Sequence, residues 1–532
     1  MEILPKLQRE ELEALRGKVI VFVGGGSSPE KRSIYEKAKS LGVKSVILDG
    51  PESWASAMVE DGTVSGYFPV AFEAETHATL ANMLAAIDKV RDEVGEPAGV
   101  CTFFEVAVPI ATRLAAALGL PANPIEAVDH ARDKHATRRI SAANGLPTPK
   151  HASIESPADI EPAASTVGFP AVIKPIGMFQ SMGVLRVDSL PELIAAYNKV
   201  LNELAAARKA ATGTADYRAT VATLEAKMVL EEFLDGEEQA RTPWPTLAHT
   251  RPPGARMEPA TASSTTTSSN QHYVLPRERN LQSLLSFCSR RRLTCWDASW
   301  QVVDIVLQDG ECVYASVTDN WAATRSFETA QGKFNETGAS SPSLLSSRQQ
   351  TELIELGVAS TKALGFQLGV FCLNLKYTSR GARLIEINSR MGGMFVRDHN
   401  RLCWGVDLVE EHLLTTVGLR CRPPKAAAPL RASAGIYVSA ESSGTITDTS
   451  VLEEYEREAQ SGKGSIFSYF RPMVKSGDTV LGPIDASDFP TWLCGFMLHA
   501  PTVNEAKKHA KRVNNEVVRR VATFSHAHGA LA

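Results

Sequence analysis

The sequence lacks several features that would assign it to large classes of protein. It has no apolar run approaching the roughly 20 residues that cross a bilayer, and the early run Val19–Val23 fits a single strand rather than the core of a signal peptide. The formal net charge is -4, which gives no basic field to hold nucleic acid or an anionic membrane. The eight cysteines show neither CxxC nor metal-ligand spacing, which is typical of a reducing compartment. We therefore expect a cytoplasmic protein that acts on small molecules and binds neither nucleic acid nor membrane.

The sequence does have the length and the alternating pattern of an α/β enzyme. A chain of 532 residues is too long for one hydrophobic core, so we expect two or three domains. Within residues 1–125, short apolar strands alternate with helices, which predicts a parallel α/β domain. Its first strand runs into the glycine turn 24–28, which could hold a phosphate, although a tight turn is the commoner meaning of one glycine cluster.

A second module is expected over residues 126–238, where a helix at 132–144 precedes strands at 171–174, 183–187 and 228–233. A third module, residues 302–425, begins with a hairpin around Asp309-Gly310.

Residues 426–532 form a C-terminal α/β domain in this interpretation. The helix after Thr502 has apolar side chains at helical spacing, which predicts core packing or a subunit contact: Ala506, Ala510, Val513 and Val517.

The stretch 239–301 fits none of these modules. It is rich in Ser, Thr and Pro, includes TASSTTTSSN, and has eight arginines from Arg241 to Arg292 but no lysine. Such a composition cannot bury much apolar area, so we expect it to be largely disordered. It is interpreted as an insertion or as a gene-model artefact such as a translated intron.

Two strands near 369–375 and 382–387 carry the most informative polar pattern. Because side chains alternate along a strand, Glu386 and Asn388 should project from one face, opposite Asn374 on the partner strand. Carboxylate and amide oxygens gathered there would suit Mg²⁺. A Glu-x-Asn pattern alone is more often an ordinary exposed edge, so its sequence context decides.

That context resembles a known family. LIEINSRMGG on a strand, after the strand FCLNLKYT, resembles the metal-binding core of ATP-grasp ligases. RMGGMFVRDH, GVDL, VTDN and FNETGASSPSLL are similar to the corresponding blocks of carnosine synthases, in the same order. The resemblance covers about residues 131–414 apart from the insertion. It implies a mixed α/β and α+β ATP-grasp fold with an N-terminal parallel α/β (pre-ATP-grasp) domain.

The resemblance also implies an activity and its cofactors. ATP, with Mg²⁺ or Mn²⁺, would phosphorylate a carboxylate, and an amine would then attack the acyl phosphate, with β-alanine and L-histidine as the expected amino-acid substrates. Homo-oligomers are common among such ligases, so self-association is an open alternative here.

The nucleotide site is carried over residue by residue. Lys134 in ARDKHATRR and Lys174 in GFPAVIKP resemble the two lysines that reach the phosphates, although either alone could be a surface residue. The rest of the implied site comprises the mobile loop and the adenine- and ribose-binding linker: Gly177, Ser181, Gly183, Glu231, Phe233, Leu234 and Glu238.

Two arginines are candidates for binding the reacting groups. Arg390, four residues after Glu386, is placed to meet the transferred phosphoryl group or the acyl oxygen, and Arg397 to hold a substrate carboxylate. Asp398 could pair with Arg397 or bind the substrate amine. Structural salt bridges are the alternative for both arginines.

One residue departs from the family pattern. Asn374 stands where the family has a glutamate, which removes a negative charge and predicts weaker Mg²⁺ binding. This keeps open the alternative of a nucleotide-binding protein with a regulatory role and little ligase activity. A separate alternative is an ATP-grasp ligase of other specificity. No biotin-attachment sequence such as MKM occurs.

Overall fold

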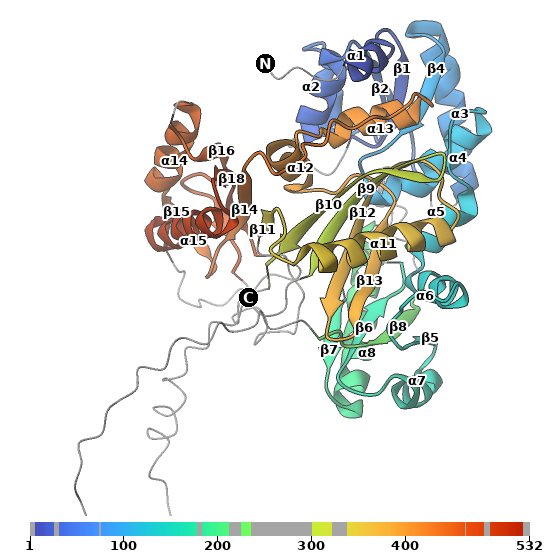
Figure 1. Cartoon of the computed structure of the whole chain (residues 1–532), viewed down its shortest axis with the longest axis vertical. Coiled ribbons are helices and arrows are strands. Elements are labelled where there is room, and N and C mark those ends of the chain that lie inside the picture. Colours follow the sequence, from blue (N-terminus) through green and yellow to red (C-terminus); the bar gives the residue numbers. More distant parts are fainter. Residues whose placement is uncertain are drawn as a thin grey trace, which may run out of the picture. The chain divides into compact units, whose positions relative to one another are not determined.

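The fold is described from a computed structural model of the chain (Figure 1), whose described residues belong to one compact unit. These residues are 6–25, 31–73, 76–177, 183–211, 225–235, 300–321, 338–462, 464–482 and 490–524. The predicted insertion, residues 239–301, lies outside them except for its last two positions. Within the described residues, no helix is both long enough and apolar enough to span a bilayer.

The N-terminal region is the parallel α/β structure that the sequence predicts. Its four strands pair in parallel in the order β3-β2-β1-β4, and the bounds are β1 (Val19–Val23), β2 (Lys44–Asp49), β3 (Gly66–Pro69) and β4 (Pro97–Cys101). The helices are α1 (Lys6–Glu13), α2 (Arg32–Ser40), α3 (Thr76–Glu93) and α4 (Val108–Ala117). Strand β1 is buried along its whole length, as its unbroken apolar sequence requires in a sheet covered on both faces.

The glycine turn after β1 is tight, at least at its first two positions. Gly24 has a φ of 77°, and the N–H of Gly25 donates to Oδ2 of Asp49 at 2.7 Å. A Cβ on Gly25 would lie 2.5 Å from that of Ala55, so only glycine fits. Positions 26–28 lie outside the described residues.

A second sheet is antiparallel, in the order β5-β8-β6-β7, with β5 (His151–Ile154), β6 (Ala171–Pro175), β7 (Leu185–Val187) and β8 (Met228–Glu232). The helices of this part of the chain are α5 (Ile125–Arg132), which packs on β13 of the sheet described next, α6 (Lys134–Ala143), α7 (Ile160–Val167) and α8 (Leu190–Ala211). The predicted helix 132–144 was wrong at its start. Asp133 adopts an extended conformation and accepts the N–H of Ala136 at 2.8 Å, so it separates two helices and caps the second.

The third sheet has eight strands in the order β13-β12-β9-β10-β11-β14-β18-β16. Their bounds are β9 (Gln301–Gln308), β10 (Glu311–Asn320), β11 (Ala339–Ser341), β12 (Gly369–Thr378), β13 (Gly381–Asn388), β14 (Ala432–Ser439), β16 (Phe467–Pro472) and β18 (Trp492–Ala500). The predicted β9–β10 hairpin is confirmed, with positive φ at both Asp309 and Gly310. The sheet is continuous across residue 425, because β11 pairs with β14.

The remaining helices pack on this sheet and on the N-terminal one, and the remaining strands form an antiparallel sheet in the order β17-β15-β19. They are α11 (Ser347–Ala363), α12 (Val396–Trp404), α13 (Leu408–Thr416), α14 (Ser450–Gln460), α15 (Val503–Arg520), β15 (Gly444–Asp448), β17 (Thr479–Val480) and β19 (Ala522–Phe524). Helix α13 contacts α2 and β4, so the segment after β13 returns to the N-terminal region (Figure 1). The apolar face predicted for the helix after Thr502 is buried in the core of the C-terminal region.

Candidate active site

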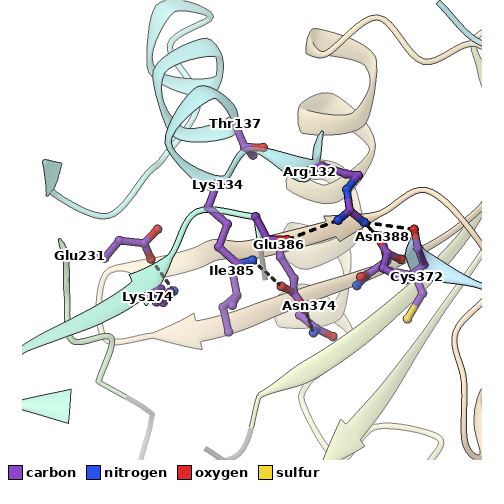
Figure 2. A network of polar contacts seen from close by, with 12 residues as sticks. Arg132, Lys134, Thr137, Lys174, Glu231, Cys372, Asn374, Ile385, Glu386 and Asn388 are labelled. Atoms are coloured by element: carbon purple, nitrogen blue, oxygen red, sulfur yellow. Dashed lines mark hydrogen bonds and ion pairs between the residues drawn. The ribbon is translucent and has the colours of Figure 1, made fainter. Parts of the chain in front are cut away.

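The polar strand pair lies at one edge of the eight-stranded sheet. Asn374 on β12 is directly opposite Glu386 on β13, and the Asn374 amide donates from Nδ2 to Oε1 of Glu386 at 2.8 Å (Figure 2). On the other face, Leu384 and Ile387 are buried in the core; they are three residues apart because the register of β12 and β13 shifts by one residue at Ile385. Beyond this bulge, alternation places Glu386 and Asn388 on one face, as the sequence predicts.

The third member of the predicted metal set, Asn388, lies two residues further along the same face. Its Nδ2 donates to the carbonyl of Cys372 at 3.1 Å. With both amide nitrogens used as donors, Oδ1 of Asn374 and of Asn388 remain as oxygen donors near the Glu386 carboxylate. This set of one carboxylate and two amides chemically fits one hard divalent ion. Among the described residues, no group of three or more His, Cys, Asp or Glu side chains could hold a metal.

Lys134, the first residue of α6, extends toward the same strand pair (Figure 2). Its Nζ lies 3.9 Å from Oε2 of Glu386. Burial lowers the pKa of Lys134, opposed by the nearby charge of Glu386 and reinforced by Lys174 and Arg132. Lys174 and Arg132 therefore bring two more positive charges close to Lys134.

Lys174 on β6 meets a different carboxylate. Its Nζ donates to Oε2 of Glu231 on β8 at 2.6 Å (Figure 2). Arg138, one turn after Lys134 on α6, forms an ion pair from Nε to Oε1 of Glu231 at 3.0 Å. Burial alone would raise the pKa of Glu231, but Arg138 and Lys174 outweigh it and lower that pKa to about 2. Glu231 is therefore a buried carboxylate that stays ionised because two cations share it.

Arg138 is one of three residues of this site that the sequence did not predict; the others are Arg132 and Glu105. Only 1% of the Arg138 surface is exposed, and its Nη2 donates to the carbonyl of Ile385 on β13. Its four-residue spacing from Lys134 on one helix was an available signal, because such residues share a helix face. The next residue, Arg139, is exposed in the structure. The sequence alone gives no reason to choose Arg138 over Arg139 as the buried arginine.

The segment predicted to bind adenine follows β8. Phe233 lies between the guanidinium of Arg186, 4.4 Å from its ring centroid, and Nζ of Lys376 at 5.6 Å. Nζ of Lys376 also donates to the carbonyl of Leu234 at 3.0 Å, and burial lowers the pKa of Lys376 to about 8. This segment is thus held at its backbone by a strand of the large sheet. Glu238 lies outside the described residues.

The predicted loop between β6 and β7 is described only at its ends. The carbonyl of Gly177 accepts from Nη2 of Arg132 at 3.3 Å. Gly183 has a φ of 68°, and a Cβ there would lie 2.8 Å from Cγ of Pro175, so glycine is required. Ser181 lies outside the described residues.

Arg390 and Arg397 both form ion pairs in the structure. Nε of Arg390 lies 2.8 Å from Oε2 of Glu105, a carboxylate that Arg132 also approaches to 3.5 Å. Arg390 is 18% exposed, and its assignment to the reacting groups stays a prediction.

Arg397 is bound more completely. It donates from Nε and Nη2 to both oxygens of Asp407 at 2.8 Å, and Asp407 in turn caps α13. Asp398 approaches Arg401 at 3.6 Å rather than Arg397. This geometry supports the salt-bridge alternative for Arg397, while a substrate role for it stays a prediction.

The comparisons agree with this fold. One family model, described as the ATP-grasp domain, matches residues 167–244, and another, the ATP-grasp N-terminal domain, matches residues 35–122. The L-amino acid ligase from Bacillus licheniformis superposes with a TM-score of 0.64 at 18% identity, covering 94% of this chain and 98% of that one. Residues 35–122 and 167–244 are therefore similar to ATP-grasp domains, and the chain has the fold of an ATP-grasp ligase.

Curated proteins that are similar to parts of this chain include carnosine synthases and a D-alanine–D-alanine ligase. Carnosine synthase 1 from Mus musculus is 25% identical over 423 residues, which is 78% of this chain and 41% of that protein. Carnosine synthase 1 from Gallus gallus is 32% identical over 197 residues, 37% of this chain and 20% of that protein. A D-alanine–D-alanine ligase from Ectopseudomonas mendocina is 45% identical over 67 residues, 13% of this chain and 21% of that protein. The chain spans about two fifths or less of the length of the carnosine synthases it matches.

Proposed function

We propose that the chain is an ATP-dependent ligase that joins a carboxylate to an amine through an acyl phosphate, with β-alanine and L-histidine as substrates. The observation that carries the proposal is a surplus of partly and fully buried positive charge. Five cations face three carboxylates, which leaves an excess of two positive charges: Arg132, Lys134, Arg138, Lys174 and Arg390 against Glu105, Glu231 and Glu386. A buried excess of this kind favours a polyanion such as a triphosphate.

The roles of the chain's own groups follow from this charge distribution. Lys134 and Lys174 would hold phosphate oxygens, and Arg390 would leave or share Glu105 to meet the transferred phosphoryl group. A carboxylate oxygen of the first substrate attacks the γ-phosphorus and ADP leaves. The amine then attacks the acyl carbon, loses a proton and displaces inorganic phosphate. Catalysis here consists mainly of alignment and charge stabilisation.

Adenine binding at Glu231 would require a change in the contacts of this carboxylate. Both oxygens of Glu231 contact cations, so the carboxylate could accept from the adenine amino group only alongside, or in place of, one of these contacts. The backbone at Phe233 and Leu234, fixed through Lys376, offers the ring edge a rigid partner. Glu386, Asn374 and Asn388 would hold Mg²⁺ or Mn²⁺, which when bound neutralises phosphate charge.

We also propose the functional divisions of the chain and its setting. Residues 1–125 would form the pre-ATP-grasp domain, 126–238 the small nucleotide-binding subdomain, 302–425 the catalytic subdomain and 426–532 a C-terminal domain. The substrates would be small amino acids in the cytoplasm.

The test is a screen of purified protein for ADP release with pairs of amino acids, including β-alanine with L-histidine. We expect release that needs ATP, a divalent ion, a carboxylate donor and an amine donor together. Release with another pair would keep the ligase and replace the substrates. ATP-dependent release without any amine requirement would contradict the proposed second step.

A second candidate is favoured by one observation, the amide at position 374 that donates to Glu386 in place of a second carboxylate. This would be a nucleotide-binding protein with a regulatory role and little ligase activity. Binding of ATP without turnover for any pair, even in Asn374→Glu, would support it over the ligase.

A further inference from the structure

Two cations share one carboxylate at the inner side of the proposed nucleotide site. Arg138, Glu231 and Lys174 come from α6, β8 and β6, and all three are at least nine-tenths buried. Arg138 lies 3.0 Å from Oε1 of Glu231 and also donates from Nη2 to Oε2 at 3.3 Å, the oxygen that Lys174 contacts at 2.6 Å. The carboxylate therefore has one more cation than its charge requires.

The two cations are held very differently. Arg138 has only 1% of its side chain exposed and also donates to the carbonyl of Ile385, the residue before Glu386 on β13. Lys174 is 10% exposed, and among the described residues its ammonium contacts only Glu231. A lysine chain can rotate about several bonds, whereas a guanidinium bonded in two directions cannot. Lys174 is the cation that can move.

We propose that Arg138 is a positioning residue that keeps Glu231 paired while Lys174 turns from Glu231 to a phosphate oxygen of the bound nucleotide. The inference rests on the proposed function, because it requires ATP at this site. It adds a residue and an exchange of partners that the nucleotide-binding assignment of Lys174 does not contain.

The physical reason is the cost of leaving a buried charge unpaired. If Lys174 were the sole partner of Glu231, its departure would strand a carboxylate that is only 2% exposed. With Arg138 in place the carboxylate keeps a cation throughout, so Lys174 can move at little cost. Arg138 also ties Glu231 to β13, and so holds this exchange in register with Glu386.

The experiment measures ATP binding by calorimetry with Mg²⁺ and no amino acid, using the full chain. In Arg138→Met, Lys174 should stay on Glu231, and the dissociation constant for ATP should rise at least about tenfold. Arg138→Lys keeps a cation beside Glu231 and should bind within about threefold of wild type. The matched control is Arg139→Met, the exposed neighbour on the same helix, which should bind as wild type.

A double variant separates this role from a merely structural one. Arg138→Met with Glu231→Gln leaves no carboxylate to retain Lys174, and the amide still offers an oxygen, so ATP affinity should recover to within about threefold of wild type. In the ADP-release assay, Arg138→Met should raise KM for ATP and leave KM for the amino acids unchanged.

Several results would overturn the inference. The inference is wrong if Arg138→Met binds ATP with wild-type affinity, or if the double variant binds ATP as weakly as Arg138→Met. Neither result would contradict the proposed function. If Arg138→Met does not fold, the double variant and Arg138→Lys decide, because a tenfold loss of affinity in either contradicts the exchange. A wild-type chain that does not bind ATP overturns the proposed function and this inference together.

Discussion

Placing a glutamate at position 374 should lower the stability of the metal-free protein and increase its affinity for Mg²⁺. Asn374→Glu replaces an amide that donates to Glu386 at 2.8 Å with a second carboxylate at the same place. The lost hydrogen bond to a charged group is worth about 1.5–3 kcal/mol. Two like charges about 4 Å apart repel by about 4 kcal/mol at an effective dielectric constant of 20.

The net loss should be smaller than these two figures combined. The side chain of Glu386 is 29% exposed, so water screens the repulsion, and one carboxyl can take up a proton. We expect the metal-free variant to lose about 1–2 kcal/mol, or roughly 1–2 °C in apparent melting temperature for a chain of this length. Because protonation relieves the repulsion, the loss should shrink as the pH is lowered toward about 5.

A divalent ion should reverse the effect. The added charge should lower the Mg²⁺ concentration for half-maximal ADP release at least about tenfold, and Mg²⁺ should raise the melting temperature of Asn374→Glu more than that of wild type. Thermal melts in EDTA and in Mg²⁺ measure this directly. The matched control is Asn374→Gln, which has the same length as glutamate but no charge. If the glutamate and glutamine variants respond alike to Mg²⁺, the metal does not lie at Glu386.

The remaining predictions concern three other carboxylates or arginines. Burial raises the pKa of Asp304 to about 7. The stability that protonated Asp304 contributes is fully present below the pKa of this carboxyl in the unfolded chain, and it is lost as the pH rises through about 7. Asp304→Asn should therefore be more stable than wild type by about 1–3 kcal/mol at pH 8 and not at pH 4.5, and melts across this range that show a constant difference would refute it. Arg397→Met should lose about 2–3 kcal/mol, because the nearly buried Asp407 loses its closest cation at both oxygens and keeps the Val409 N–H at 3.1 Å and two more distant cations at 3.8 and 3.9 Å. Arg401→Met, 51% exposed, should change stability by less than about 0.5 kcal/mol. A raised KM for the carboxylate substrate in Arg397→Met, with unchanged stability, would show a substrate role instead. Glu386→Gln should reduce ADP release at least about a hundredfold while the protein stays folded by circular dichroism, and near-normal turnover would count against this site.

The part of the site that follows from local pattern could be predicted from the sequence. Alternation along β13 placed Glu386 and Asn388 on one face, and the pairing with β12 put Asn374 opposite, as the register shows. The parallel strands of the N-terminal region and the Asp309-Gly310 hairpin were equally readable, because each depends on neighbours within a few residues. The missed start of α6 arose because Asp133 ends one helix and caps another.

What the sequence by itself determined is therefore the order of the elements, the polar face of the β12–β13 strand pair, and the resemblance to ATP-grasp ligases. Only the tertiary structure decided which charge meets which. Glu231 is 93 residues from Arg138 and 57 from Lys174. Arg390 forms an ion pair with Glu105, which follows β4 of the N-terminal sheet. Such pairings depend on how separate elements pack, and no periodicity along the chain encodes the distance between them. The buried excess of positive charge, on which the proposed function depends, exists only once α6, β6, β8 and β13 have come together.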